Sequence, residues 1–175
     1  MATPLEIERK WMVSGWPENC EDDLPDGGLK LPLLEELDME QGYVTTKPTV
    51  RIRREGDAFV LCFKSKSQDR GLSRKELEFE IPEERFEELK EFIGLPLIHK
   101  VRRTYVLPDG LRLEVNHVDE GLPTEFWYAE VEFGSVDTAE TWKPADVQLE
   151  HYLNNEVTKL KGQSMAAYWR QTREN

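Results

Sequence analysis

The first residues of this chain whose types and spacing could do chemistry are Glu6, Glu8 and Lys10. Successive side chains of a β-strand point to opposite faces, so these three charges would share one face of a strand. Ile7 and Trp11 would lie on the other face. Two carboxylates beside an ammonium group can bind a cation and an anion together. The same alternation recurs along most of the chain, and this recurrence predicts a functional face.

The charged faces of the predicted strands contain cations and anions in similar numbers. The alternative interpretation is an ordinary solvated sheet surface packed on helices. Because the chain is strongly acidic, a surface that served only for solubility would be mostly negative. The large number of cations on these faces therefore favours a binding face. The cations are Lys10, Arg51, Arg53, Lys64, Arg74, Lys100 and Arg102, and the anions are Glu6, Glu8, Glu76, Glu78, Glu114, Glu130 and Glu132.

This combination of charges indicates the class of ligand. Arginine forks and lysine ammonium groups select a multiply charged oxyanion such as a polyphosphate. Clustered glutamates select a hard divalent cation, Mg²⁺ or Mn²⁺. Both sets in one cavity predict a metal-complexed polyphosphate. The sequence contains neither G-x-x-x-x-G-K-[ST] nor G-x-G-x-x-G, which excludes a P-loop and a Rossmann site.

Alternation and turn residues predict the elements that position these charges. An α+β fold follows, with a closed antiparallel eight-stranded β-barrel and flanking helices. We expect the charged faces to point into the barrel and the helices to cover its apolar outer faces. Strands are expected over residues 5–13, 41–46, 49–55, 58–65, 73–81, 98–106, 111–118 and 126–133. Helices are expected over residues 31–39, from Pro82 to Gly94, and over 144–154 and 163–172.

Length and composition limit the other possibilities. The 175 residues form one domain (1–175) by size, and the formal charge of −12 argues against nucleic acid or an anionic membrane as partner. Cys20 and Cys62 provide neither a disulfide framework nor a metal-binding spacing. No apolar run is long enough to span a membrane, so we expect a cytoplasmic protein. A monomer and a homodimer are equally compatible with the sequence.

The order of the charged residues resembles that of the CYTH superfamily, also called triphosphate tunnel metalloenzymes. The short single-domain bacterial branch is the most similar. Its E-x-E-x-K signature matches Glu6, Glu8 and Lys10. The resemblance implies a closed eight-stranded tunnel, in agreement with the alternation. Its other elements are Gln41-Gly42-Tyr43, Arg51-x-Arg53, Lys64, Arg74-x-Glu76-x-Glu78, Lys100-x-Arg102, Glu114, Glu130-x-Glu132 and Glu156-Val157-Thr158.

The resemblance also implies roles for these residues. Glu6, Glu8 and Lys10 are expected to be the catalytic signature. The triphosphate is expected to be held by Lys10, Arg51, Arg53, Lys64, Lys100 and Arg102, together with Arg74 and, from the C-terminal segment, Lys161. The metal is expected on Glu6, Glu8, Glu130 and Glu132, with Glu76, Glu78 and Glu114 as further candidates.

One position departs from the family pattern. Many relatives have an aspartate in the strand after the Pro-Asp-Gly turn, where this chain has Asn116. An amide offers an oxygen to a hard cation but brings no charge, so one metal position is expected to be weakened. Glu114 and Asp119 are the candidates to compensate. Without compensation the protein would bind phosphate and turn over slowly.

The expected activity is metal-dependent hydrolysis of a triphosphate, foremost inorganic tripolyphosphate. One metal would act as a Lewis acid and a second would lower the pKa of the attacking water, with no protein nucleophile assigned. The alternatives are a class IV type adenylate cyclase acting on ATP, a thiamine triphosphatase, and a polyphosphate- or nucleotide-binding protein without turnover.

Two arginines provide controls for this interpretation. Arg54 and Arg103 adjoin the expected ligands in sequence and are expected to point away from the cavity. Cys62 shares the face of Lys64 and is expected to line the cavity without thiol chemistry.

Overall fold

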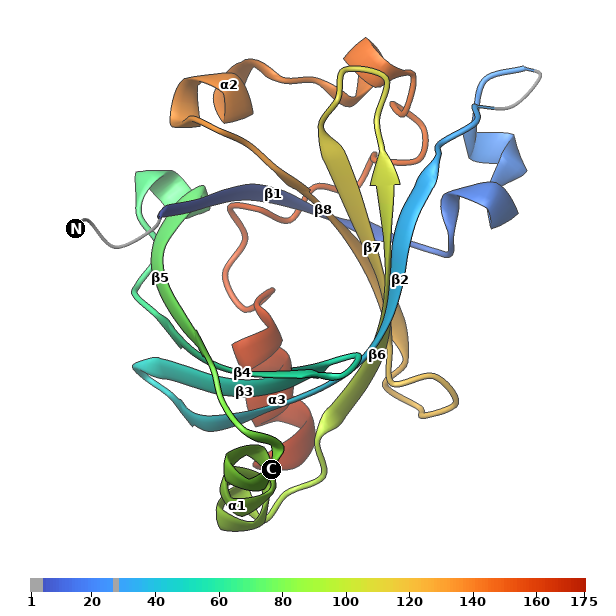
Figure 1. Cartoon of the computed structure of the whole chain (residues 1–175). Coiled ribbons are helices and arrows are strands. Elements are labelled where there is room, and N and C mark those ends of the chain that lie inside the picture. The colour runs from blue at the N-terminus through green and yellow to red at the C-terminus, as the bar shows by residue number, and fades with distance from the viewer. Residues whose placement is uncertain (1–4, 27–28) are drawn as a thin grey trace.

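The structure is a computed structural model that describes residues 5–26 and 29–175. Over these residues eight antiparallel strands close into a barrel in the order β1-β5-β4-β3-β2-β6-β7-β8 (Figure 1). The predicted α+β class and the closed eight-stranded barrel are confirmed. The strands are β1 (Leu5–Val13), β2 (Leu33–Thr46), β3 (Thr49–Glu55), β4 (Ala58–Lys64), β5 (Ser73–Glu80), β6 (Ile98–Val106), β7 (Arg112–Val118) and β8 (Phe126–Glu132).

Strand β1 closes the barrel by pairing with two strands. Its residues 5–7 pair with β5, and its residues 8–13 pair with β8. Because side chains alternate along the strand, Glu6, Glu8 and Lys10 line the interior cavity. Ile7 and Trp11 are buried in the core that covers the barrel from outside. The first strand therefore has the two faces that the sequence predicts.

Strand β2 corrects one expectation. The helix expected over 31–39 is wrong, because Leu33–Thr46 is a single long strand. Its first part pairs with β6 and its second part with β3, so the backbone is hydrogen-bonded on both sides. The leucines, glutamates and methionine of this segment are good helix formers, but helix propensity is a weak preference and pairing within the barrel overrides it.

Two of the expected helices are confirmed. Helix α1 (Glu83–Ile93) follows Pro82 and ends at Gly94, which has a φ of 68° that suits glycine. Helix α3 (Met165–Arg173) lies within one or two residues of its expected bounds and begins after the capping side chain of Ser164. Both pack against β2.

The expectation of a helix over 144–154 is wrong for most of that range. Only a short 3-10 turn, η4 (Pro144–Val147), forms there, and it ends at Gln148, whose φ is 61°. A helix that the sequence reasoning missed, α2 (Val136–Thr141), begins after Ser135, whose hydroxyl accepts a hydrogen bond from the Thr138 amide. The other 3-10 turns are η1 (Pro17–Asn19), η2 (Glu21–Asp23) and η3 (Asp69–Gly71).

The apolar outer faces of the barrel are only partly covered, in contrast to the expectation. The segment that follows β8 packs Trp142 and Leu149 over β1, β7 and β8, and α1 packs Phe86 against Phe59 of β4. On β4 and β5, Phe63 and Leu77 remain 39% and 44% exposed. None of the helices in the described part of the chain has the length and apolar character needed to cross a membrane.

Candidate functional site

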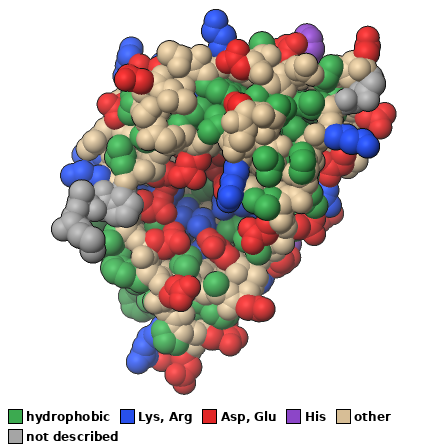
Figure 2. Space-filling model, turned by 45° about the horizontal axis from the view of Figure 1, so that its top comes forward, with side chains coloured by type: hydrophobic (Ala, Val, Ile, Leu, Met, Phe, Trp, Pro, Cys, Tyr) green, Lys and Arg blue, Asp and Glu red, His purple; other side chains and the backbone are tan. Residues whose placement is uncertain are grey.

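A cavity of about 1080 Å³ occupies the interior of the barrel. Figure 2 shows its mouth as a hollow in which acidic and basic side chains gather. Every side chain that the sequence assigns to the site lines this cavity, including Lys161 from the C-terminal segment. The full set is Glu6, Glu8, Lys10, Arg51, Arg53, Lys64, Arg74, Glu76, Glu78, Lys100, Arg102, Glu114, Glu130, Glu132 and Lys161.

Ion pairs between side chains of different strands hold part of this lining in place. Lys64 on β4 lies 3.2 Å from a carboxylate oxygen of Glu6 and 3.6 Å from one of Glu76. Arg102 on β6 lies 3.6 Å from Glu114 on β7. Lys64 and Glu76 are paired in register on adjacent strands, whereas Lys64 reaches Glu6 across the intervening strand β5. The rim of the cavity is thus preorganised by its own charges.

Arg53 has a partner that the sequence reasoning missed. Its guanidinium contacts Glu55 and lies 3.9 Å from Glu78 on β5. Glu55 also lines the cavity. It continues the alternation of Arg51 and Arg53 along β3, and this spacing is the signal that would have identified it.

The centre of the cavity is crowded with buried cations. Arg51, Arg53 and Lys100 are 6%, 7% and 1% exposed. Burial lowers the pKa of Lys100 well below its ordinary value, and the charges of Arg102, Arg53 and Arg51 lower it further. The Nε atoms of Arg51 and Arg53 are buried and have no hydrogen-bond partner among the described residues. An anion with several oxygens would satisfy both the charge and these donors.

A carboxylate cluster faces these cations. Burial raises the pKa of Glu8 well above its ordinary value, and the charges of Glu130 and Glu6 add to the shift. Although burial alone would raise the pKa of Glu130, the hydrogen bond from Glu8 and the charge of Lys10 lower it. Oxygen donors that repel one another in a buried site match the ligand preference of Mg²⁺ and Mn²⁺. The residues present therefore fit a divalent cation.

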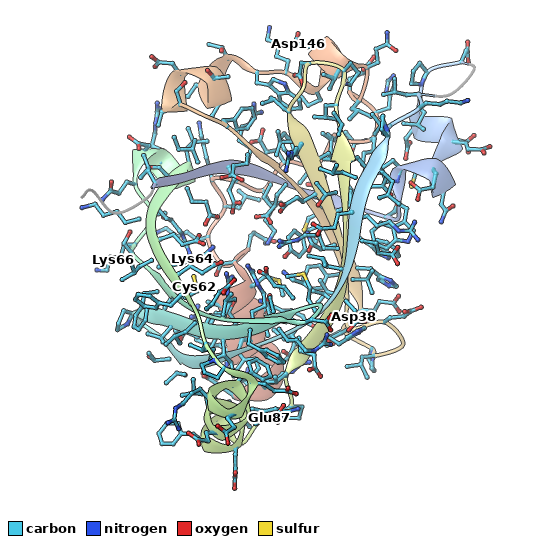
Figure 3. The ribbon with its side chains drawn as sticks, in the orientation of Figure 1. Asp38, Cys62, Lys64, Lys66, Glu87 and Asp146 are labelled. Atoms are coloured by element: carbon cyan, nitrogen blue, oxygen red, sulfur yellow. The ribbon has the colours of Figure 1, made fainter. Side chains whose placement is uncertain are left out.

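A second carboxylate group lies on β5 beside β4. The ligand atoms of Cys62, Glu76 and Glu78 all lie within 4.8 Å of one another. Figure 3 shows Cys62 and Lys64 on the inner side of the barrel wall, whereas Glu87 lies at the periphery on α1. Cys62 is a free, fully buried cysteine that is not among the described residues lining the cavity, contrary to expectation, and its sulfur lies 3.7 Å from an Arg51 nitrogen.

The C-terminal segment adds a wall of which the sequence analysis predicted only Lys161. Residues 157–166 line the cavity after the chain pairs with β1, where the Val157 amide donates to the Lys10 carbonyl at 2.9 Å. The Lys10 ammonium in turn donates to the Gln163 carbonyl at 2.5 Å. In Figure 1 this segment crosses the barrel opening before it enters α3.

One end of the barrel interior is closed by apolar side chains. Tyr43, Ile98, Val118 and Tyr128 form a buried cluster with Trp169 of α3. The rings of Tyr43 and Trp169 have their centroids 5.7 Å apart. The charged part of the cavity therefore adjoins a packed aromatic wall at this end.

The position of Asn116 is in the barrel interior, but Asp119 does not replace the missing aspartate. Asp119 is 3% exposed, forms a two-point ion pair with Arg173 at 2.7 and 3.0 Å, and accepts a hydrogen bond from Tyr168. These contacts attach α3 to the barrel. Of the two candidates to compensate, only Glu114 lines the cavity.

The two control arginines point away from the cavity, as predicted. Arg54 lies 2.6 Å from Asp38 and Arg103 lies 2.6 Å from Glu18, on the outside of the barrel. Both are absent from the cavity lining within the described residues. They remain suitable controls for substitutions inside the barrel.

Comparisons with known proteins agree with this geometry. No protein-family model matches the chain. The inorganic triphosphatase of Nitrosomonas europaea is 34% identical over 160 residues, which cover 89% of this chain and 91% of that protein. The crystal structure of the inorganic triphosphatase NE1496 has a TM-score of 0.58 at 28% identity, covering 93% of this chain and 95% of that one. The structure of the PH1819 protein from Pyrococcus horikoshii OT3 shares the fold, with a TM-score of 0.64 at 18% identity over 96% of this chain and 99% of that one.

Proposed function

The chain belongs to the CYTH superfamily of triphosphate tunnel metalloenzymes, together with the inorganic triphosphatase of Nitrosomonas europaea, and we propose that it hydrolyses inorganic tripolyphosphate in its barrel cavity. The crowding of buried cations carries this proposal. Arg53 and Arg102 have carboxylate partners, but Arg51 and Lys100 form no ion pair among the described residues and lie beside those two arginines, so a polyanion would neutralise this part of the cavity. A chain of three phosphates supplies that charge in a linear form.

The arginines and lysines have separate tasks in this proposal. The forked guanidinium groups of Arg51, Arg53 and Arg102 bind non-bridging phosphate oxygens in pairs, whereas Lys10 and Lys100 act as point charges. Phosphoryl transfer depends mainly on positioning and on stabilising developing charge. A wall of fixed charges therefore provides much of the catalysis, and no protein nucleophile is assigned.

The carboxylates are proposed to hold Mg²⁺ or Mn²⁺. Glu6, Glu8, Glu130 and Glu132 are the principal ligands proposed, and Glu76, Glu78 and Glu114 are further candidates. When bound, such a cation supplies Lewis-acid stabilisation of phosphoryl oxygens and lowers the pKa of a water molecule that attacks phosphorus. Glu8 must release its proton to bind a metal, because burial and its neighbours favour its neutral form.

The closed end of the barrel leaves no room there for the organic group of a nucleotide, which would have to lie at the open mouth. A cyclase or a thiamine triphosphatase needs space for an organic group beyond the last phosphate. At this end the protein's own aromatic rings fill the space, since Tyr43 and Tyr128 are only 4% and 2% exposed. Tripolyphosphate requires no such space.

Product analysis with a substrate panel tests the proposed activity. Purified protein is incubated with tripolyphosphate, ATP or thiamine triphosphate, each with Mg²⁺, Mn²⁺ or EDTA. We expect metal-dependent release of orthophosphate and pyrophosphate, fastest from tripolyphosphate. Cyclic AMP with pyrophosphate from ATP would indicate a cyclase, and tight binding of tripolyphosphate without any turnover would indicate a binding protein. Absence of metal-stimulated phosphate release from all three substrates would contradict the proposal.

A further inference from the structure

Asn116 is held in one orientation by its neighbour on β6. The register pairs Asn116 of β7 with Arg102 of β6 and with Tyr128 of β8. The Arg102 Nε donates a hydrogen bond to the Asn116 Oδ1 at 3.1 Å. An arginine has no acceptor atom, so the amide oxygen and not the nitrogen must face Arg102. The amide oxygen is therefore already engaged by a cation.

The other end of the amide is a buried donor without a partner. The Asn116 side chain is fully buried, and its Nδ2 has no hydrogen-bond partner among the described residues. A buried N–H group without an acceptor is costly, so such a group indicates a ligand that supplies the acceptor. The Arg51 and Arg53 Nε atoms of the same barrel interior have the same deficit. All three groups are hydrogen-bond donors, and a bound anion would supply the acceptor that each of them lacks.

We infer that Asn116, which is fully buried in the barrel wall against the cavity-lining Arg102, is an anion-binding and positioning residue and not a weakened metal ligand. Its Oδ1 fixes the Arg102 guanidinium, and its Nδ2 donates to a phosphate oxygen of the bound triphosphate. This inference rests on the proposed function. Asn116 thus places a neutral donor where many relatives have a carboxylate. Two residues along the same strands, Glu114 of β7 is paired with Glu130 of β8. An aspartate at position 116 would add a like charge beside them and would offer no donor to a phosphate oxygen.

Binding of tripolyphosphate to the metal-free protein separates the two roles of Asn116. Titration calorimetry in EDTA is carried out on wild type, Asn116→Ala and Asn116→Asp. Asn116→Ala loses one hydrogen bond to the charged ligand, so we expect this variant to bind tripolyphosphate about tenfold more weakly than wild type. Asn116→Asp loses the donor and adds a negative charge, so we expect a loss of about 100-fold or more. The exposed Asn154→Asp adds the same charge outside the barrel and is expected to bind as wild type does.

The opposite pattern identifies a metal ligand. This inference would be overturned if both Asn116 variants bound tripolyphosphate in EDTA as tightly as wild type and Asn116→Ala bound Mn²⁺ more weakly. That result would leave the proposed function intact. Failure of the wild-type protein itself to bind tripolyphosphate would overturn both. Thermal unfolding of each variant shows whether it is folded, and Asn116→Ala decides the question if Asn116→Asp does not fold.

Discussion

The Lys100 ammonium donates a hydrogen bond of 2.9 Å to the Tyr128 hydroxyl, where the charged cavity meets the closed aromatic end. Both side chains are almost completely buried, at 1% and 2% exposure. The hydroxyl is a weak partner for a buried cation. The charges of Arg102, Arg53 and Arg51 also disfavour the protonated form of Lys100. Lys100 is thus the cation that gains most from the arrival of a polyanion.

We predict that tripolyphosphate binding takes up a proton at Lys100 at alkaline pH. Burial and the charges of the nearby arginines hold the pKa of Lys100 well below its ordinary value, and a bound polyanion would favour the charged form and raise this pKa. Proton uptake is measured by calorimetry at one pH in two buffers of different ionisation enthalpy. Lys100→Arg, which stays protonated, should abolish the uptake. Uptake that is unchanged in this variant would show that another group is responsible.

Substitution of neighbouring arginines tests which way the strands face. Arg53→Ala removes a buried guanidinium that is proposed to bind phosphate, and we expect kcat/KM to fall by a factor of about 100 to 1000. Arg54→Ala removes an outward guanidinium that pairs with Asp38 and Glu40, and kcat/KM should change by less than about threefold. Equal losses in the two variants, with unchanged thermal unfolding, would contradict the assignment of the inner face.

Much of the site could be predicted because alternation along a strand is a local property. Glu6 and Glu8, or Arg51 and Arg53, share a face wherever a strand forms, whatever its partners are. The inward direction came from charge balance, since a face with as many cations as anions is poorly explained by solubility. Placement of these side chains around one cavity then followed from closure of the barrel.

The missed features depend on contacts distant in sequence. Residues 31–39 have a helix-like pattern, and only pairing with β6 and β3 makes them part of a strand. Residues 157–166 have no periodicity, and they reach the cavity because Val157 is hydrogen-bonded to β1. Asp119 resembles a metal ligand in sequence, but Arg173, 54 residues later, engages its carboxylate. None of these partners is identifiable from local sequence alone.

We predict that Mn²⁺ binding strengthens as the pH rises through the pKa of Glu8. Burial and the charges of Glu130 and Glu6 keep this pKa well above its ordinary value, so a proton competes with the metal. Mn²⁺ affinity is measured by electron paramagnetic resonance between pH 5 and pH 8. Glu8→Gln should weaken binding about tenfold and flatten the pH dependence, whereas Glu87→Gln on the exposed side of α1 should leave both unchanged. A pH dependence that persists in Glu8→Gln would assign the proton to another carboxylate.

The ion pair between Asp119 and Arg173 is predicted to be a main attachment of α3 to the barrel. Its side chains are 2% and 7% exposed, and Asp119→Ala leaves a buried guanidinium without its carboxylate. We expect the free energy of unfolding to fall by about 3 kcal/mol in urea titrations at pH 7. Asp57→Ala, in an exposed turn, should change it by less than about 0.5 kcal/mol.

The pH dependence of this stabilisation provides a second test. The Arg173 and Tyr168 hydrogen bonds lower the pKa of Asp119 below its ordinary 3.8, against the effect of burial. A carboxyl with a lowered folded-state pKa stabilises the protein above its unfolded pKa, and the stabilisation is lost as the pH falls through the folded pKa. The difference in unfolding free energy between wild type and Asp119→Ala should therefore be constant from about pH 5 to pH 7 and shrink below about pH 4. A difference that does not change down to about pH 2 would show that packing, not the carboxylate charge, holds α3 in place.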